Sequence, residues 1–290
     1  MTDPRSRPRR TVVVAAVLVL AALLLSGCGN QAQETVALSA ADRSAIGACV
    51  SAVASVDHAL DAVVGAENGS LGRASAGRRL SDVTRSLQAA ADGATDDVVH
   101  QSVQDVIDSI TAYLAVLPDR SISGYDDAVT DTRGRLAGFR RTCPVANGSF
   151  DSGISGWAPI SPSSDLSQAS AGRGRGHGLV LVNRGKEPSV VGATDSAAWV
   201  ERTWRGVYRA GLWARAETGT PELTLMIQEK AKNAEVGEAR TTVRLGVEWT
   251  FIGVSYKATG QGGPLEIRIM TDELAAATAV HLDDVAVARG

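Results

Sequence analysis

The chain has 290 residues, a length that suits about two domains. Its formal net charge at pH 7 is −3, from 29 Lys and Arg against 32 Asp and Glu. This near-neutral balance gives no bulk electrostatic attraction to nucleic acid, so we do not expect a nucleic-acid partner.

The N-terminus has the layout of an export signal. Four arginines, Arg5, Arg7, Arg9 and Arg10, precede the apolar run Val12–Leu25. A helix that spans a membrane needs about 20 apolar residues, so this shorter run favours a signal peptide over a permanent span. The Arg9-Arg10 pair leaves open whether export follows the general secretory or the twin-arginine route.

The apolar run ends in Leu25-Ser26-Gly27-Cys28. This sequence resembles the lipobox of bacterial lipoproteins, where a branched apolar residue and two small residues precede a cysteine that takes lipid. The resemblance implies that residues 1–27 are a lipoprotein signal peptide, that Cys28 carries the lipid (palmitate among its chains), and that residues 28–38 are a tether. Two or more acyl chains would anchor the protein stably to the bilayer, on the extracytoplasmic face of the cell membrane. The alternative is an ordinary cysteine in a plain signal peptide or anchor.

Residues 39–143 contain no tryptophan and show the periodicity of helices. Ser39, followed three residues later by Asp42, is typical of a capping box at a helix start. Apolar residues then recur at intervals of three and four, interrupted by Asn68-Gly69, Gly93 and Pro118. Four amphipathic helices with short connections predict an up-down-up-down bundle. The apolar stripes are Ile46, Cys49, Val53, Val56, Leu60 and Val63; Leu80, Val83 and Leu87; Val99, Val103, Val106, Ile110 and Leu114–Leu117; and Ile122, Tyr125, Val129, Thr132, Leu136, Phe139 and Cys143.

Two of the three cysteines lie on these stripes. Cys49 is near the start of the first helix and Cys143 is at the end of the fourth. In an up-down-up-down bundle these two positions are at the same end, and an exported protein is in a compartment where disulfides persist. The sequence therefore predicts a Cys49–Cys143 disulfide; the alternative is two buried free thiols.

Residues 145–290 contain all five tryptophans and differ in class from the helical part. Short alternating runs separated by Gly, Pro and Asp predict a two-sheet β-sandwich or jelly roll. The Ser-, Gly- and Arg-rich stretch Pro159–Gly178 is expected to be a long mobile loop. The predicted strands are Leu179–Asn183, Trp199–Trp204, Val207–Ala216, Leu223–Gln228, Thr241–Arg244, Thr250–Lys257, Leu265–Met270 and His281–Ala288.

Motifs in this second part follow a recognisable order. The segment Asn147–Trp157 has the pattern N-x-x-F-D followed by G-W, and Gly206–Ala216, Glu248-Trp249 and His281–Val285 come after it. Together they resemble carbohydrate-binding modules of families 4 and 9, over essentially all of residues 146–289. The resemblance implies a galactose-binding-like β-sandwich that binds carbohydrate.

The same resemblance implies a structural calcium ion. In these modules the ion is held by an early acidic residue and by acidic residues of the last strand, which correspond here to Asp151, Asp283 and Asp284. Oxygen ligands of this kind suit calcium. The family's early glutamate is Asp151 in this chain, one methylene shorter. The alternative is that Asp151 caps a turn and that Asp283 and Asp284 begin a loop.

Strand alternation suggests a sugar-binding surface. Tyr208, Ala210, Leu212, Ala214 and Ala216 should point inward, which places Arg209, Trp213 and Arg215 on the outer face. An indole can stack on a sugar ring while guanidinium groups bind hydroxyls. The alternatives are that loops cover Trp213 or that both faces of the sheet are packed. The other residues expected on this surface are Met226, Gln228, Glu266 and Arg268, whereas Trp157 and Trp249 are expected in the core and Trp199 and Trp204 stay unassigned.

The sequence gives no recognisable catalytic motif. It lacks H-E-x-x-H, C-x-x-C and a phosphate-binding glycine loop, and its histidines, His58, His100, His177 and His281, are scattered. We therefore expect no enzyme, but a membrane-anchored extracytoplasmic lipoprotein that binds a cell-envelope or extracellular polysaccharide. Two alternatives stay open: a protein-interaction or envelope-structural lipoprotein whose sandwich has lost sugar binding, and an accessory part of a glycoside hydrolase system.

Overall fold

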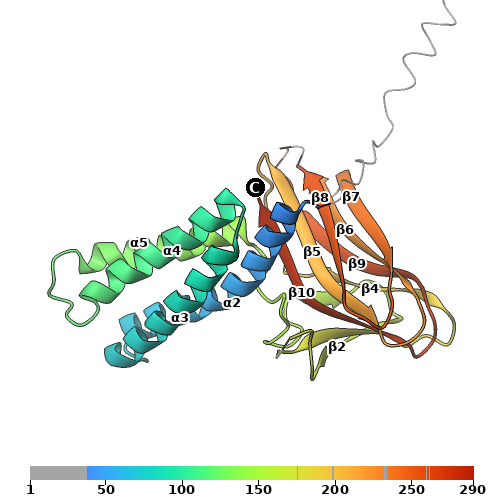
Figure 1. The fold of residues 1–290 in the computed structure, drawn as a ribbon, viewed down its shortest axis with the longest axis horizontal. Helices are drawn as coiled ribbons and strands as arrows, with labels where there is room; N and C mark the ends of the chain where they lie inside the picture. The colour runs from blue at the N-terminus through green and yellow to red at the C-terminus, as the bar shows by residue number, and fades with distance from the viewer. Residues whose placement is uncertain (1–37, 175, 198, 232–233, 259, 261) are drawn as a thin grey trace, which may run out of the picture. The chain divides into compact units, whose positions relative to one another are not determined.

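The structure, a computed structural model, describes residues 38–290 except residues 175, 198, 232, 233, 259 and 261. Cys28, the predicted signal peptide 1–27 and nearly all of the predicted tether lie outside the described residues. The described residues form one compact unit, in which four helices precede two stacked antiparallel sheets (Figure 1).

The four predicted helices are present, with ends set by local chemistry. Ser39 caps the first helix: its hydroxyl accepts the Asp42 N–H at 3.1 Å, and the Asp42 carboxylate accepts the Ser39 N–H at 2.9 Å. Gly69 ends that helix with a φ of 78°, which favours glycine. The helices are α2 (Ala40–Asn68), α3 (Arg73–Gly93), α4 (Asp97–Val116) and α5 (Tyr125–Thr142).

One helix boundary differs from the prediction. Ile122 was expected on the apolar stripe of the fourth helix, but α5 begins at Tyr125 and Ile122 is 42% exposed in the preceding turn. Asp119 explains why the helix begins later than predicted, because its carboxylate accepts the Ser121 N–H at 2.8 Å and so favours a turn before the helix.

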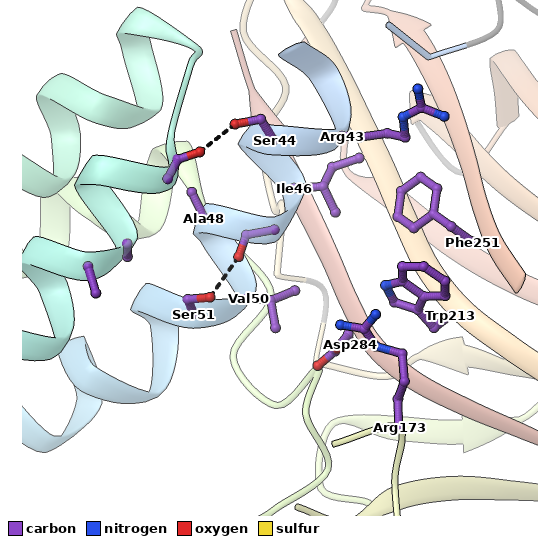
Figure 2. A pocket seen from close by; sticks show the side chains of 14 residues that line it. Arg43, Ser44, Ile46, Ala48, Val50, Ser51, Arg173, Trp213, Phe251 and Asp284 are labelled. Atoms are coloured by element: carbon purple, nitrogen blue, oxygen red, sulfur yellow. Dashed lines mark hydrogen bonds and ion pairs between the residues drawn. The ribbon is translucent and has the colours of Figure 1, made fainter. Parts of the chain in front are cut away.

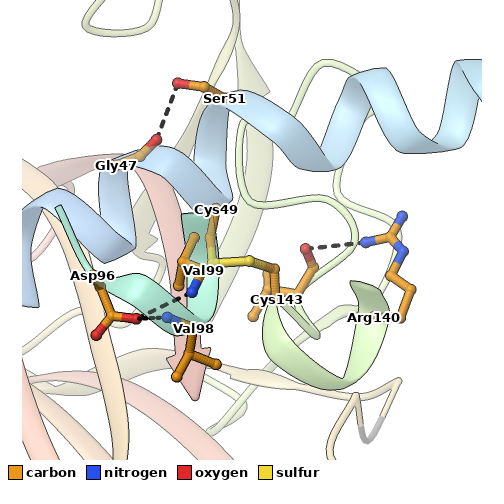
Figure 3. Close-up of a disulfide and its surroundings, with 9 residues drawn as sticks. Gly47, Cys49, Ser51, Asp96, Val98, Val99, Arg140 and Cys143 are labelled. Atoms are coloured by element: carbon orange, nitrogen blue, oxygen red, sulfur yellow. Dashed lines mark hydrogen bonds between the residues drawn. A yellow bond between two sulfur atoms is a disulfide. The ribbon is translucent and has the colours of Figure 1, made fainter. Parts of the chain in front are cut away.

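The predicted disulfide is confirmed. Cys49 of α2 is bonded to Cys143, the residue that follows α5, with 5.3 Å between their Cα atoms (Figure 3). Both cysteines are fully buried in the helical core. The bond ties the two ends of the helical region together. By length and hydropathy alone, α2 is also the one described helix that could span a membrane, although half of that apolar stretch is buried here.

Two five-stranded antiparallel sheets form a β-sandwich of the jelly-roll type, as the sequence predicted. We name each sheet after one of its strands, as the β6 sheet and the β5 sheet. In spatial order, the β6 sheet contains β1 (Trp157–Pro159), β4 (Ser189–Asp195), β9 (Leu265–Leu274), β6 (Glu222–Ala231) and β7 (Ala234–Arg244). The β5 sheet contains β2 (Ser164–Ala169), β3 (Gly178–Asn183), β10 (Ala279–Arg289), β5 (Val207–Ala216) and β8 (Thr250–Lys257).

The alternation predicted for β5 is confirmed, since Tyr208, Ala210, Leu212, Ala214 and Ala216 are all buried in the sandwich core. Two other predictions are wrong. The stretch 159–178, expected to be a loop, contains β2, a polar strand that pairs along its whole length with β3. The segment 199–204, expected to be a strand, makes one isolated bridge between Val200 and Leu265.

The helical region packs on the outer face of the β5 sheet through small residues. Gly211 of β5 and Gly253 of β8 are direct cross-strand partners. A Cβ atom on Gly211 would lie 2.9 Å from Ile46 of α2, and one on Gly253 would lie 2.2 Å from Leu38. The absence of side chains at these two glycines therefore lets the start of α2 lie directly against the sheet. We call this patch the docking strip; it also includes Ala286 and Ala288 of β10, which are buried against the helical core.

An ion-pair network flanks the docking strip. Arg209, on the outer face of β5, pairs with Asp42 in the first turn of α2 and lies 3.5 Å from the carboxylate of Asp96, the N-cap of α4. These three side chains are mostly buried, with at most 20% of each exposed. Arg209 therefore joins the sheet to two helices.

Candidate functional site

The predicted sugar-binding residues lie on opposite outer faces of the sandwich. Met226, Gln228 and Arg268 belong to the β6 sheet, whereas Arg209, Trp213 and Arg215 belong to β5. In a two-sheet sandwich the outer faces point away from each other. The expectation that all of them line one surface is therefore wrong, because alternation fixes the face of a strand but not the sheet to which the strand belongs.

The outer face of the β6 sheet is a network of polar side chains that satisfy one another. Met226 is directly opposite Arg268, and Gln228 is opposite Glu266. The Gln228 amide donates to Glu235 at 2.8 Å, and Arg268 donates to Glu266 at 2.6 Å. Met226 and Gln228 are only 5% and 7% exposed. The described outward-facing residues of β6 and β9 include no aromatic side chain, so this face offers no ring on which a sugar could stack.

Of the three residues expected on the outer face of β5, Arg209 is engaged elsewhere. Its guanidinium group faces Asp42 and Asp96 across the docking strip, and 18% of its side chain is exposed. It is a contact between helices and sheet, and only Trp213 and Arg215 stay available on that face.

Trp213 lines a pocket of about 710 Å³ between α2 and the β5 sheet (Figure 2). Phe251 of β8 is its cross-strand partner, and the two rings meet edge to face with centroids 5.5 Å apart. The guanidinium carbon of Arg173 lies 4.1 Å from the centroid of the indole. The pocket thus has an aromatic floor, with a cation stacked on one of its rings.

Polar groups surround this aromatic pair. Arg173 also pairs with Asp284, at 3.3 Å, and Figure 2 shows both at the Trp213 end of the pocket. Arg43 extends from α2 at the Phe251 end, and Ser51 lies on the α2 wall. A volume of this size, with apolar rings and a few polar groups, is typical of small-molecule sites.

The outer face of the β5 sheet continues beyond the pocket. Arg215 lies over the ring of Trp249, 5.3 Å from its centroid, and is the cross-strand partner of His281. Trp249 is only partly buried, so its expected place in the core is wrong. Burial and the Arg215 charge lower the pKa of His281, which is therefore neutral at pH 7. We call the residues Trp213, Arg215, Trp249, Phe251 and His281 the aromatic face.

The predicted calcium ligands are gathered around the backbone of Arg173 and His177. Asp283 accepts the N–H of Arg173 at 2.6 Å, and Asp151 accepts the N–H of His177 at 3.0 Å. Burial, together with the charges of Asp284 and Asp151, raises the pKa of Asp283 to about 6. The three carboxylates are thus close enough to interact. Across the described part of the chain, however, no group of three or more His, Cys, Asp or Glu side chains is arranged to hold a metal ion.

The remaining tryptophans are now placed. Trp157 is buried in the sandwich core, as expected, and its indole N–H donates to the Asn147 carbonyl at 3.2 Å. Trp199 packs edge to face on Trp157, with centroids 5.1 Å apart. Trp204 is 51% exposed, with Arg202 over its ring, and lies outside the Trp213 pocket.

Several pocket residues could not be identified from the sequence. Phe251 could have been assigned to the outer face from the sequence, since alternation along Thr250–Lys257 places it on the same face as Gly253. Arg173 lies in a turn without periodicity, and Arg43 and Ser51 belong to a helix whose contact with the sheet depends on the tertiary fold.

Comparisons with solved structures concern about half of this chain. A family 61 carbohydrate-binding module in complex with β-1,4-galactotriose matches 51% of this chain and 99% of its own, at 19% identity and a TM-score of 0.40. The family 22 xylan-binding domain of Paenibacillus barcinonensis Xyn10C matches 49% of this chain and 91% of its own, at 15% identity and a TM-score of 0.40. An arabinose-bound family 51 α-L-arabinofuranosidase matches 51% of this chain but only 26% of the enzyme, at 18% identity and a TM-score of 0.43. No protein-family model and no curated protein matches the chain.

Proposed function

We propose that this protein is a lipid-anchored, extracytoplasmic lipoprotein whose β-sandwich binds a polysaccharide and has no catalytic role of its own. The glycan would come from the cell envelope or the surroundings. The observation that carries the proposal is the Trp213 pocket, which combines two aromatic rings with guanidinium, carboxylate and hydroxyl groups in about 710 Å³. The resemblance of the sequence motifs to carbohydrate-binding modules of families 4 and 9 supports the same conclusion.

Each component of the pocket suits one part of a sugar. The apolar face of a pyranose ring can stack on an indole, and Trp213 presents its ring beside that of Phe251. Hydroxyl groups of the sugar need donors and acceptors, which Arg173, Asp284 and Ser51 supply around the rings. The β6 sheet, in contrast, has an outer face of mutually paired polar groups without aromatic rings.

Affinity gel electrophoresis against a panel of soluble polysaccharides tests this proposal. The mature chain with Cys28→Ser would be used, so that lipid does not interfere. We expect retardation by at least one polysaccharide and a loss of about tenfold or more in affinity for Trp213→Ala, because stacking of a sugar on an aromatic ring carries much of the energy at such sites. Trp204→Ala is the matched control, since it removes an exposed tryptophan outside the pocket. No retardation by any polysaccharide contradicts the proposal.

One observation favours a second candidate, a protein-interaction function. Arg173 already covers one face of the Trp213 ring at 4.1 Å, which reduces the area open to a sugar. A peptide could use the same pocket through side chains that fit beside the stacked pair. Recovery of one stoichiometric protein partner from a membrane fraction, lost in Trp213→Ala and insensitive to added glycans, would favour this alternative.

The anchoring part of the proposal rests on the sequence at Cys28. Partition into the detergent phase of Triton X-114 and labelling with radioactive palmitate test it in cells that express the full chain. We expect both signals for the native chain, because lipid chains are what would hold the mature protein at the bilayer. Cys28→Ala should lose the palmitate label, whereas its uncleaved apolar run Val12–Leu25 can still partition into detergent. Equal palmitate labelling of the two chains contradicts a lipid on Cys28.

A structural calcium ion is the third part of the proposal. Asp151, Asp283 and Asp284 would hold it: their oxygens are the ligands calcium prefers, and burial of Asp283 and Asp284 leaves the repulsion between these two carboxylates incompletely screened. The bound ion would supply positive charge to this cluster. We expect calcium to raise the melting temperature of the native chain, and EDTA to reverse the rise, with no response in Asp283→Asn. An unchanged melting temperature with calcium argues against the ion.

A further inference from the structure

The charges around the Trp213 pocket are not balanced. Arg173 pairs with Asp284 at 3.3 Å, and Arg209 is neutralised by Asp42 and Asp96. Arg43 and Arg215, in contrast, form no ion pair within the described part of the chain. Of these two guanidinium groups without a carboxylate partner, Arg43 lines the pocket, whereas Arg215 lies beyond the pocket lining, over Trp249 on the same outer face of β5.

These two arginines flank the aromatic pair from different elements. Arg43 lies on α2 at the Phe251 end of the pocket (Figure 2). Arg215 is two positions beyond Trp213 on β5, so the two side chains are on the same face and about 7 Å apart along the strand. A sugar chain stacked on Trp213 would thus pass close to at least one of them.

Arg215 also has an unsatisfied donor. Its Nε atom is buried and has no hydrogen-bond partner, and the Nδ1 atom of the neighbouring His281 is in the same state. A buried N–H without an acceptor carries a desolvation cost. Because Nε is fully buried, a ligand oxygen reaches it only if the Arg215 side chain moves. Guanidinium groups bind carboxylates and phosphates in particular, because their planar donors match two oxygens at once.

We propose that the glycan bound at the Trp213 pocket is acidic, with carboxylate or phosphate groups that pair with Arg215 and Arg43. This inference rests on the proposed glycan-binding function. The acidic groups bind on the aromatic face and at the Phe251 end of the pocket, because Arg173 at the other end is already paired with Asp284.

Matched pairs of polysaccharides test the charge requirement. Polygalacturonate and its methyl ester differ in the carboxylate, and phosphomannan and its dephosphorylated form differ in the phosphate. For the Cys28→Ser mature chain, we expect at least one acidic polymer to bind about tenfold tighter than its neutral counterpart, as for a charge-assisted hydrogen bond. The preference should weaken as the salt concentration rises. The pair of polysaccharides that shows this preference identifies the acidic group as a carboxylate or a phosphate.

Variants then locate the contact. We expect Arg215→Gln or Arg43→Gln to abolish most of the acidic preference, while Arg215→Lys keeps part of it because the charge is retained. Arg244→Gln is the control, since it removes one exposed positive charge from the β6 sheet. Thermal unfolding of each variant verifies that it is folded.

The outcomes separate the two proposals. Equal binding of the acidic and neutral members, or an acidic preference unchanged in both Arg→Gln variants, overturns this inference and leaves a neutral glycan site in place. Failure of every polysaccharide to bind overturns the glycan-binding function itself.

Discussion

Removal of the Cys49–Cys143 disulfide should destabilise the protein strongly. The bond connects residues separated by 94 positions and so encloses α3, α4, α5 and all of α2 after its first nine residues. In the chain-entropy model, a closed loop of this length restricts the unfolded chain by about 4–5 kcal/mol at 25 °C. We expect the double variant Cys49→Ala/Cys143→Ala to lose at least about 4–5 kcal/mol of unfolding free energy, because both side chains are fully buried and small cavities add to the loss.

Urea unfolding followed by circular dichroism at 222 nm measures this loss, in a Cys28→Ser background that removes the remaining thiol. The unfolding free energy and the m-value should be compared with those of the parent under oxidising conditions. The parent treated with reductant is a second test, which should move its midpoint toward that of the double variant. A loss below about 1 kcal/mol would refute the reasoning, since the loop would then be ordered in the unfolded state or the bond absent.

Two other predictions concern stability. Gly211→Val should lower the unfolding free energy by about 1–3 kcal/mol, because a Cβ atom there lies 2.7 Å from Phe251 and 2.9 Å from Ile46. Gly134→Ala is the control and should not lower the unfolding free energy, because the space around Gly134 is open. An unchanged stability of Gly211→Val would mean that α2 does not lie against the sheet. Burial raises the pKa of Asp195 to about 6 from an ordinary 3.8, so the folded state binds more protons between these two values and its stability falls as pH rises through that window. Relative to the parent, the unfolding free energy of Asp195→Asn should therefore rise by up to about 3 kcal/mol between pH 4 and 7 in urea titrations. A difference in unfolding free energy that does not change with pH would contradict the raised pKa.

The sequence predicted most of the helical region because its signals are local. The capping box at Ser39, the glycine after Asn68 and the apolar stripes specify helix ends and faces directly. The disulfide followed from these stripes and from the up-down topology, since both cysteines fall at one end of the bundle. The start of the fourth helix was predicted too early because Ile122, an apolar residue in the preceding turn, happens to fit the apolar spacing of that helix.

The sandwich was predicted less completely for physical reasons. β5 and β8 alternate clearly and were found with their observed bounds, whereas β2 is polar on much of its length and carries no hydrophobic pattern. The sheet to which each strand belongs depends on long-range pairing, so Met226 and Trp213 were placed on one surface although they are on opposite faces. Trp249 was placed in the core, but it precedes β8 on the outward side.

The candidate site was predicted in part. Trp213 and Arg215 were identified by alternation alone, and their outer position is confirmed. The pocket itself depends on α2, which approaches the sheet only because Gly211 and Gly253 lack side chains. That contact between distant segments has no local signature, which is why Arg43 was missed and why Arg209 was assigned to sugar rather than to Asp42.

A structure of the mature chain in complex with an oligosaccharide tests the central claim most directly. The oligosaccharide would be cut from whichever polysaccharide retards the protein. We predict a sugar ring stacked on Trp213 in the pocket between α2 and the β5 sheet. A sugar bound instead on the β6 sheet around Met226, or against the exposed Trp204, would contradict it.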